Sequence, residues 1–541
     1  MRMPALRKEW RGSALLLALS LLHTWWRYSL PGITADGQTY LQIARNIHYG
    51  AGLGWQALWA PPLHSVLIAL AGWLPGVPDL KTAAGIVSPL AGALLPLAVY
   101  LLASRAFNRT TALAAGILAV FFPHFDFIQF SPEAEVTYTL LLILSLYLTL
   151  KSFQEASLST AAAAGMSWAL TWMGRSEGFL VMALTLGMCG VVQARHSAAR
   201  FARLTALLLA VFALTASPYL FFLKQHYGKL TMSPKATYVL IWMKSRIYHD
   251  NDKGEVDNDE LWGLTPDYRL KWQTPSGFGE LAGYLMSHPE KSARVYLHNV
   301  SLQIPGRIPN NSGIQHYPQV FPIYLSLAAL FAAFRRWGDG SPLKKAVIFA
   351  PLLILLILPV FTEGWWKYLV PYAPLLIISA SGGLFMLPGQ QSRRYLPWAV
   401  TLFLAGYFAY CLIGKPAPPP NSNVQMRRAY AEQAGKAARW IRARYGPGKN
   451  YMVAWNKMIY ELDGLWTADP VADLPAKLEY ARRNRVDYYL MEFSASQISP
   501  VEIMLPPPGL ALDTVYQSPD SDYCVAVYRL ASPFPQPGSH Q

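Results

Sequence analysis

The stretch from Thr82 to Ala103 reads TAAGIVSPLAGALLPLAVYLLA and contains no charged side chain. A helix needs about 20 mostly apolar residues to cross the hydrocarbon core of a bilayer, so this stretch predicts a membrane span. Ten further runs are also mostly apolar, at 12–29, 110–128, 134–150, 158–174, 177–193, 203–223, 318–334, 346–361, 367–387 and 396–414. The sequence therefore predicts an α-helical polytopic membrane protein with about 11 transmembrane helices.

The composition of the whole chain agrees with this prediction. Of the 541 residues, 53% are hydrophobic and only 14% are charged, whereas about a quarter of the residues in ordinary soluble domains are charged. The net charge of +15 comes from short basic clusters between apolar runs. Such clusters indicate membrane topology, so we expect no nucleic-acid partner. The cysteines, Cys189, Cys411 and Cys524, have neither a disulfide framework nor zinc-ligand spacing.

Basic residues also set the predicted orientation. Arg2, Arg7, Lys8 and Arg11 precede the first span, and the positive-inside rule therefore places the N-terminus in the cytoplasm. The short apolar stretch 62–77 is predicted to lie along the membrane, because counting it as a span would invert the charge asymmetry of every later loop. With eleven spans, the C-terminus is extracytoplasmic. The lack of a retention signal favours a bacterial inner (plasma) membrane, with the C-terminal domain in the periplasm.

The predicted topology divides the chain into two domains. Residues 1–414 form the transmembrane domain, which carries extracytoplasmic loops at 30–61 and 224–317. The tail at 415–541 opens on a proline-rich linker and is predicted to be a small extracytoplasmic α/β domain. Its expected helices are at 427–445 and 473–485, and its expected strands are at 451–455, 487–493 and 522–530.

Asp36 opens a predicted amphipathic helix in the first extracytoplasmic loop. Tyr40, Ala44 and Ile47 share one face of this helix, at spacings of four and three residues. A carboxylate at a helix start is favoured by the free N–H groups there. Asp36 is therefore either an N-cap or a functional carboxylate held at the membrane surface on a rigid element.

A second polar group follows between the third and fourth spans, with His124, Asp126, Glu133 and Glu135. Glu135 begins an apolar run, where an ionisable side chain is costly and indicates a functional site. Asp, His and Glu can all bind a divalent metal. Because no tight ligand motif is present, these residues leave metal binding open.

Two isolated cations, Arg175 and Lys367, interrupt apolar runs on the predicted outer side. They either anchor the helices at the interface or bind a lipid phosphate. Carboxylates and cations on one side of the membrane suit the transfer of a group from a lipid phosphate to a hydroxyl. A carboxylate can act as general base on the hydroxyl, and cations can stabilise the departing phosphate.

The order of these motifs resembles that of the GT-C glycosyltransferases that use polyprenyl-phosphate sugars, such as protein O-mannosyltransferases and the lipid A aminoarabinose transferase. Asp36-Gly-Gln-Thr-Tyr resembles their acidic first-loop motif, and Ala60-Pro-Pro-Leu-His-Ser resembles their Pro-Pro-Leu-Tyr-Pro element. Glu135 resembles the glutamate that opens the fourth helix. Arg175-Ser-Glu-Gly and Lys367-Tyr-Leu-Val-Pro resemble their Arg-Pro-Glu-Gly turn and Arg-Tyr-hydrophobic-Pro segment.

The resemblance implies a GT-C fold and an inverting hexosyl- or pentosyltransferase. The donor would be a sugar on a polyprenyl phosphate, and the acceptor a hydroxyl of a lipid, glycan or protein. Asp36 would be the general base, with Glu135 as a second catalytic residue, and Arg175 and Lys367 would bind the donor phosphate. The residues expected around the substrate cavity are Tyr40, His64, His124, Asp126, Glu133, Glu177 and Tyr368. No cofactor is certain, and a divalent metal is possible, although the single first-loop acid argues against it.

Two other classes of protein stay open. A transporter or lipid flippase usually shows inverted repeats and ionisable residues near the bilayer midplane, and neither feature is found in the sequence. An oligosaccharide polymerase or ligase overlaps with a glycosyltransferase in chemistry and is harder to exclude. The sequence names neither the sugar nor the acceptor.

Overall fold

The computed structural model describes residues 3–28, 35–228, 230–232, 263–271, 278–303, 342–361, 366–385, 395–412, 422–453, 458–495 and 506–531. The chain divides into two compact units. The first consists of Met1–Gly32, Ala60–Pro234 and Tyr284–Pro418, and the second of Ile33–Trp59, Lys235–Gly283 and Pro419–Gln541. The first loop, which carries Asp36, therefore belongs to the same unit as the C-terminal segment.

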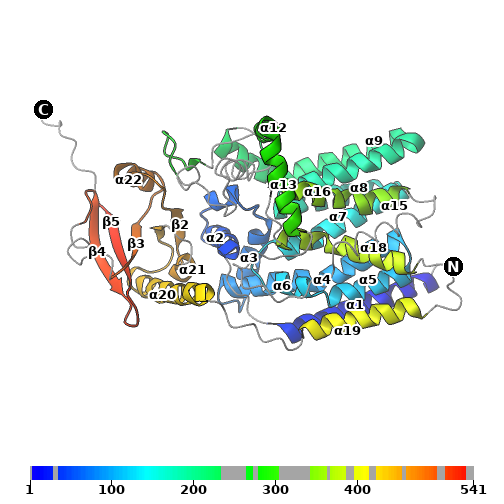
Figure 1. The fold of residues 1–541 in the computed structure, drawn as a ribbon, viewed down its shortest axis with the longest axis horizontal. Coiled ribbons are helices and arrows are strands. Elements are labelled where there is room, and N and C mark those ends of the chain that lie inside the picture. The colour runs from blue at the N-terminus through cyan, green and yellow to red at the C-terminus, as the bar shows by residue number, and fades with distance from the viewer. Residues whose placement is uncertain are drawn as a thin grey trace. The chain divides into compact units, whose positions relative to one another are not determined.

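The first unit is helical (Figure 1). Its helices are α1 (Met3–Arg27), α3 (Leu63–Gly72), α4 (Leu80–Ala106), α5 (Arg109–Val120), α6 (Pro123–Gln129), α7 (Glu135–Glu155), α8 (Leu158–Gly174), α9 (Glu177–Tyr227), α13 (Pro289–Gln303), α15 (Pro342–Phe349), η3 (Ala350–Leu353), α16 (Ile354–Phe361), α17 (Trp366–Leu369), η4 (Val370–Tyr372), α18 (Ala373–Phe385) and α19 (Leu396–Leu412). Successive helices α7, α8 and α9 pack against one another, and α4 packs against both α5 and α7. Helix α12 (Phe278–Ser287) crosses the chain boundary between the two units.

Several of these helices have the length and composition of membrane spans. In the described part of the chain, four apolar stretches are long enough to cross a bilayer, namely Leu80–Ala106, Glu135–Glu155, Ser197–Tyr227 and Pro342–Val360. Helix α9 contains the two spans predicted at 177–193 and 203–223, separated by a kink at Ser197. Other predicted spans overlap α1, α8, α18 and α19. The span predicted at 318–334 lies outside the described residues.

The span predicted at 110–128 is not one continuous helix in the structure. Helix α5 has 12 residues and ends at Val120, and α6 begins at Pro123. Phe122 is extended, with φ −69° and ψ 114°, because the proline ring disfavours a helical conformation of the residue before it. A 12-residue helix is about 18 Å long, so α5 alone does not cover a hydrocarbon core of about 30 Å. Helix α3, inside the stretch expected to lie along the membrane, has only 10 residues.

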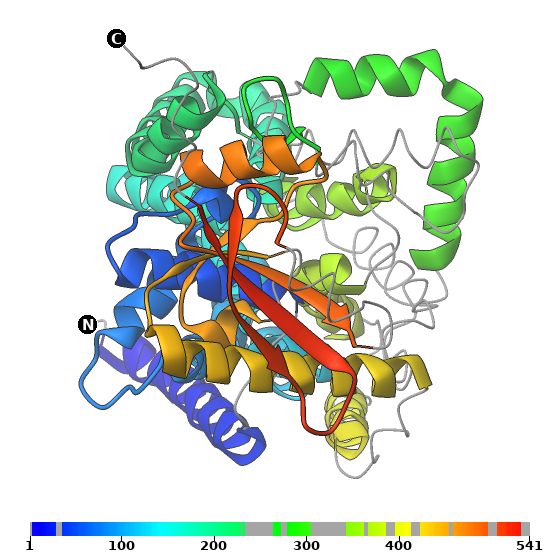
Figure 2. The same ribbon diagram turned by 90° about the vertical axis from the view of Figure 1, so that its left-hand side faces the viewer.

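The second unit contains a five-stranded mixed sheet (Figure 2). Its elements are α2 (Ala35–His48), η1 (Trp55–Leu58), α20 (Ser422–Tyr445), β1 (Asn450–Val453), α21 (Ile459–Leu462), β2 (Leu465–Ala468), α22 (Leu474–Arg483), β3 (Tyr488–Ser494), β4 (Leu510–Gln517) and β5 (Tyr523–Leu530). The strand order is β2-β1-β3-β5-β4. Strands β2, β1 and β3 run parallel, whereas β3, β5 and β4 pair antiparallel.

The core of the sheet lies on its inner strands. Val525, Ala526 and Val527 of β5 are fully buried, as is Tyr451 of β1. Side chains on a strand alternate between the two faces, so consecutive buried residues show that both faces of β5 are covered. The strands expected at 451–455, 487–493 and 522–530 overlap β1, β3 and β5, whereas β2 and β4 had not been predicted.

Helix α20 ends where the sequence predicted. Its last residue is Tyr445, and Gly446 follows with φ +79°. The Gly446 N–H donates to the Arg442 carbonyl at 2.8 Å, a common way to end a helix because glycine adopts the left-handed conformation without a steric cost. The chain then turns directly into β1.

Candidate functional site

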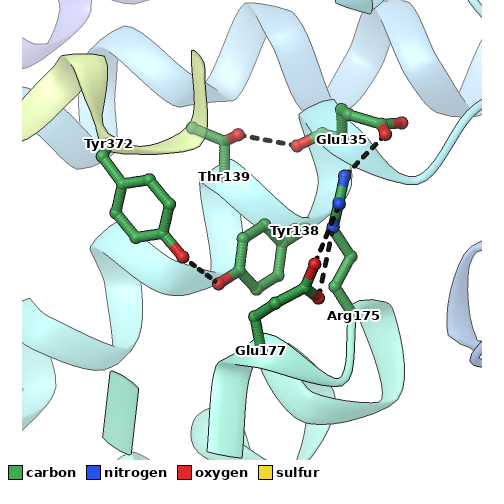
Figure 3. A network of polar contacts seen from close by, with 6 residues as sticks. All are labelled: Glu135, Tyr138, Thr139, Arg175, Glu177 and Tyr372. Carbon is green, nitrogen blue, oxygen red and sulfur yellow. Dashed lines mark hydrogen bonds and ion pairs between the residues drawn. The ribbon is translucent and has the colours of Figure 1, made fainter. Parts of the chain in front are cut away.

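Arg175 is the centre of a buried charged cluster in the helical unit (Figure 3). Its Nη1 donates to Glu135 Oε1 at 2.6 Å, and its Nη2 donates to Glu177 Oε1 at 3.0 Å. The side chains of Arg175 and Glu135 are only 8% and 5% exposed, whereas that of Glu177 is 28% exposed. Two carboxylates therefore share one guanidinium, and Glu177 is the more exposed of the two.

The helix ends explain why these three residues meet. Glu135 and Glu177 are the first residues of α7 and α9, and Arg175 follows the last residue of α8. Carboxylates are favoured at helix N-termini and cations at C-termini, so each charge agrees with the local helix dipole. A Cβ on Gly178 would lie 3.0 Å from the Thr171 carbonyl oxygen, so glycine permits the close start of α9 beside α8.

Tyrosine rings surround the guanidinium. The Arg175 Cζ lies 4.8 Å from the ring centroid of Tyr368 and 5.8 Å from that of Tyr138. The hydroxyls of Tyr138 and Tyr372 are 3.2 Å apart in a buried hydrogen bond. A guanidinium over an aromatic face gains cation–π attraction, which strengthens when the pair is shielded from water. The cluster is thus a charged site with apolar walls.

One oxygen of the cluster has no hydrogen bond. Glu135 Oε2 is buried without a hydrogen-bond partner among the described residues. An unsatisfied buried acceptor costs free energy. Among the described residues, the cluster therefore combines two carboxylates that pair with one guanidinium with one carboxylate oxygen that accepts no hydrogen bond.

His64, which is expected near the substrate cavity, contacts two neighbouring helices. It is fully buried on α3. Its Nδ1 is 3.0 Å from the Thr137 hydroxyl on α7, and its Nε2 is 3.5 Å from the Ser88 hydroxyl on α4. The imidazole thus joins three helices through polar contacts inside the core.

The other predicted site residues are placed as follows. Asp36 is partly exposed in the first turn of α2, and Tyr40 is buried on the same helix. Glu133 is buried before α7, His124 is partly exposed on α6, and Tyr368 is partly exposed on α17. Asp126 and Lys367 lie in α6 and α17, but their side chains are outside the described part of the structure.

The structure brings Glu135, Arg175, Glu177 and Tyr368 together, and adds Tyr138 and Tyr372 to them. Tyr138 comes one helical turn after Glu135 and was a polar residue inside an apolar run. That position was a signal that could have predicted it. Within the described ranges, no group of three or more His, Cys, Asp or Glu side chains is arranged to hold a metal ion.

Comparisons with known proteins agree with this architecture. Residues 60–222 match the family described as dolichyl-phosphate-mannose-protein mannosyltransferase. The apo structure of the Archaeoglobus fulgidus oligosaccharyltransferase superposes with a TM-score of 0.53 at 13% identity, over 89% of this chain and 69% of that one. No curated protein sequence matches the chain.

Two further solved structures resemble the chain. The arabinofuranosyltransferase AftD from Mycobacteria has a TM-score of 0.50 at 16% identity, over 97% of this chain and 42% of that one. ArnT from Cupriavidus metallidurans has a TM-score of 0.46 at 14% identity, over 96% of this chain and 98% of that one.

The fold is therefore similar to that of the solved oligosaccharyltransferase and arabinofuranosyltransferase, as the resemblance to GT-C glycosyltransferases predicts. The segment that matches the mannosyltransferase family contains Glu135, Arg175 and Glu177, whereas Asp36 and Lys367 lie outside it.

Proposed function

We propose that the protein is a membrane glycosyltransferase that moves a sugar from a polyprenyl-phosphate donor to a hydroxyl group of a lipid, glycan or protein acceptor. The reaction takes place on the extracytoplasmic face of a bacterial inner membrane, in a chain of eleven spans with the N-terminus in the cytoplasm. Residues 1–414 form the transmembrane catalytic domain, and residues 415–541 form the extracytoplasmic domain.

The observation that carries the proposal is the buried Arg175 between Glu135 and Glu177, in a helical unit of GT-C fold. This cluster lies within the segment that resembles a family named for a sugar on a lipid phosphate. A guanidinium presents two parallel N–H groups that match a phosphate bidentately. The oligosaccharyltransferase neighbour has been solved with a tethered acceptor peptide.

The chemistry proposed for the residues is a single displacement. The Asp36 carboxylate takes the proton of the acceptor hydroxyl, and the acceptor oxygen forms a bond to the anomeric carbon. The bond from that carbon to the phosphate oxygen breaks, and its electron pair leaves with polyprenyl phosphate. Arg175 and Lys367 stabilise the charge that develops on this phosphate. Attack opposite the leaving group inverts the anomeric configuration.

Arg175 can present its Nε–Nη2 edge to a phosphate only if Glu177 releases that edge. In the structure, Nε and Nη2 both face Glu177, at 3.5 and 3.0 Å. We propose that the donor phosphate takes this edge when Glu177 turns toward water. Glu135 keeps Nη1 and so fixes the plane of the guanidinium. This gives Glu135 and Glu177 different roles although both pair with the same arginine.

The test uses the full chain in lipid nanodiscs with a panel of polyprenyl-phosphate sugars and candidate acceptors. Release of free polyprenyl phosphate is the readout. We expect release with one donor class and a loss of about 100- to 10,000-fold in kcat for Asp36→Asn, the usual contribution of a general base. Asp520→Asn, in an exposed ion pair with Lys436, is the matched control and should keep full turnover.

Two results would contradict the proposal. Turnover that survives Asp36→Asn would exclude Asp36 as the base. Folded protein that releases no polyprenyl phosphate from any donor, but moves a lipid across vesicles, would be a flippase instead.

A further inference from the structure

Helix α2, which carries Asp36, contacts the turn between α21 and β2. Arg45 Nε lies 3.3 Å from Asp463 Oδ1, and Gln42 Nε2 donates to the Gly464 carbonyl at 3.1 Å. Arg45 and Gln42 are only 4% and 2% exposed. Asp463 and Gly464 are the two residues that join α21 to β2. Helix α2 therefore contacts the turn that precedes β2, an edge strand of the sheet.

A second attachment follows at η1. Trp55 Nε1 and Gln56 Nε2 both donate to the Trp466 carbonyl, at 2.9 and 3.0 Å. The Trp55 and Trp466 rings also meet edge to face, with centroids 4.9 Å apart. Because β2 is an edge strand, its outer carbonyls need partners outside the sheet. The two side chains of η1 supply such partners to one carbonyl.

A hydrogen bond between a side chain of α2 and one of η1 connects the two attachments. Gln42 Nε2 also donates to Asn46 Oδ1, and Asn46 Nδ2 donates to Gln56 Oε1, both at 3.1 Å. Gly54 makes this arrangement possible: its φ is +72°, and a Cβ there would lie only 2.0 Å from Asn46 Nδ2. Helix α2 and η1 are thus hydrogen-bonded to each other. Helix α2 contacts the turn before β2, and η1 contacts β2 itself.

We infer that the C-terminal α/β segment is part of the catalytic apparatus, because it holds the helix of the catalytic base through Gln42, Arg45 and Asp463 as positioning residues. The inference rests on the proposed function, in which Asp36 is the base. It assigns to the segment a role in the chemical step, beyond any contact with the acceptor.

The physical reason is that α2 needs external support. Helix α2 has 14 residues, and an isolated helix shorter than about 12–15 residues is marginal in water. A general base must stay within hydrogen-bond reach of the proton it removes, and a displacement of about 1 Å can lower the rate by about 100-fold. Asp36 is in the first turn of α2, and Arg45 and Gln42 fix the part of the helix that follows.

The experiment compares Gln42→Met, Arg45→Met and Arg45→Lys in the full chain in nanodiscs. We expect Gln42→Met and Arg45→Met to lower kcat by about 10- to 100-fold, with the KM for the donor changed by less than about threefold. Arg45→Lys keeps the positive charge opposite Asp463, so its kcat should be higher than that of Arg45→Met. Asp520→Asn again serves as the control, since its ion pair with Lys436 is elsewhere in the same unit.

Hydrogen exchange gives a readout that does not depend on turnover. The amides of residues 35–48 should exchange faster in the two Met variants, while those of β3 and β5 keep their protection. This pattern would show that the helix is released while the sheet stays folded. Faster exchange throughout the sheet would mean that the variants unfold the unit, which would overturn a role limited to positioning.

The outcomes separate the two ideas. If Asp36→Asn abolishes turnover and the folded Arg45→Met and Gln42→Met variants keep a normal kcat, the positioning role is wrong and the proposed base stands. If the variants change only the KM for the acceptor, the segment binds the acceptor and does not position the base. If Asp36→Asn itself keeps turnover, the proposed base is wrong, and the positioning role is refuted with it.

Discussion

Two buried arginines, one in each unit, have opposite surroundings. Arg175 is 7% exposed and faces two carboxylates, Glu135 and Glu177. Arg45 is 4% exposed and shares one carboxylate, Asp463, with Arg442, whose Nη2 is 2.9 Å from Asp463 Oδ2. Around Arg175 two carboxylates share one guanidinium, whereas around Asp463 two guanidinium groups share one carboxylate.

The difference indicates different uses. In the second cluster the outer partner Arg442 has a side chain that is 48% exposed and therefore hydrated, so the inner pair can act as a permanent attachment. In the first cluster one guanidinium pairs with a buried and a half-buried glutamate. An anionic ligand can enter there by replacing the wetter carboxylate. The first cluster suits exchange of a ligand, and the second suits a fixed attachment.

Removing the guanidinium of Arg175 should have the largest effect on stability. Arg175→Met leaves the Glu135 side chain, 5% exposed, without its cation, and breaking a buried pair costs about 3–5 kcal/mol. We expect a clear fall in the melting temperature of the purified protein. Arg105→Met is the control, because the Arg105–Glu155 pair is 33% and 40% exposed and such pairs contribute about 0–1 kcal/mol. Equal melting temperatures for both variants would contradict the buried pairing.

Neutralising Asp463 should have an intermediate effect. Asp463→Asn removes the carboxylate charge beside the buried Arg45, for which we expect a loss of about 1–3 kcal/mol. Arg442→Met removes the exposed partner from the same carboxylate and should cost less than about 1 kcal/mol. Thermal unfolding of the two variants measures the difference. If Arg442→Met were the more damaging change, the assignment of Arg45 as the inner partner would be wrong.

Neutralising Glu177 should have the smallest effect on stability and should strengthen the binding of polyprenyl phosphate. Glu177→Gln leaves Arg175 paired with Glu135, so we expect a change within about 1 kcal/mol. Because the competing negative charge is removed, polyprenyl phosphate should bind roughly 2- to 10-fold more tightly, up to about 1.4 kcal/mol. Titration with the lipid in nanodiscs measures this, with Glu155→Gln as the control. Weaker binding in Glu177→Gln would show that Glu177 helps to hold the phosphate.

Local sequence features predicted much of the secondary structure. The charge-free run Thr82–Ala103 lies within α4, and the amphipathic pattern after Asp36 forms α2. The apolar run at 110–128 does not reveal the break between α5 and α6, which comes from the single residue Pro123. Strand β2 has only four residues, too few for a period-2 pattern to stand out from a loop.

The candidate site was predicted only as a set of separate charges. Arg175 stood out because it interrupts an apolar region, but its partner Glu135 is 40 residues away. Which carboxylate meets the guanidinium depends on how α7, α8 and α9 pack, and no local pattern records that packing. In the same way, Asp463 and Gln42 had no visible signal, because each matters only through a contact with the other segment.

The sequence by itself determined that the chain is a polytopic helical membrane protein, because several nearly uncharged apolar runs are long enough to cross a bilayer as helices. It also determined that the notable charges stand at helix starts and ends, where the free N–H and C=O groups favour them. Only the tertiary structure decided that Arg175 is shared between two glutamates and that the Asp36 helix belongs with the C-terminal sheet. The interaction between two charges depends on their distance and on how deeply they are buried. Both quantities are set when segments that are distant in the sequence pack together.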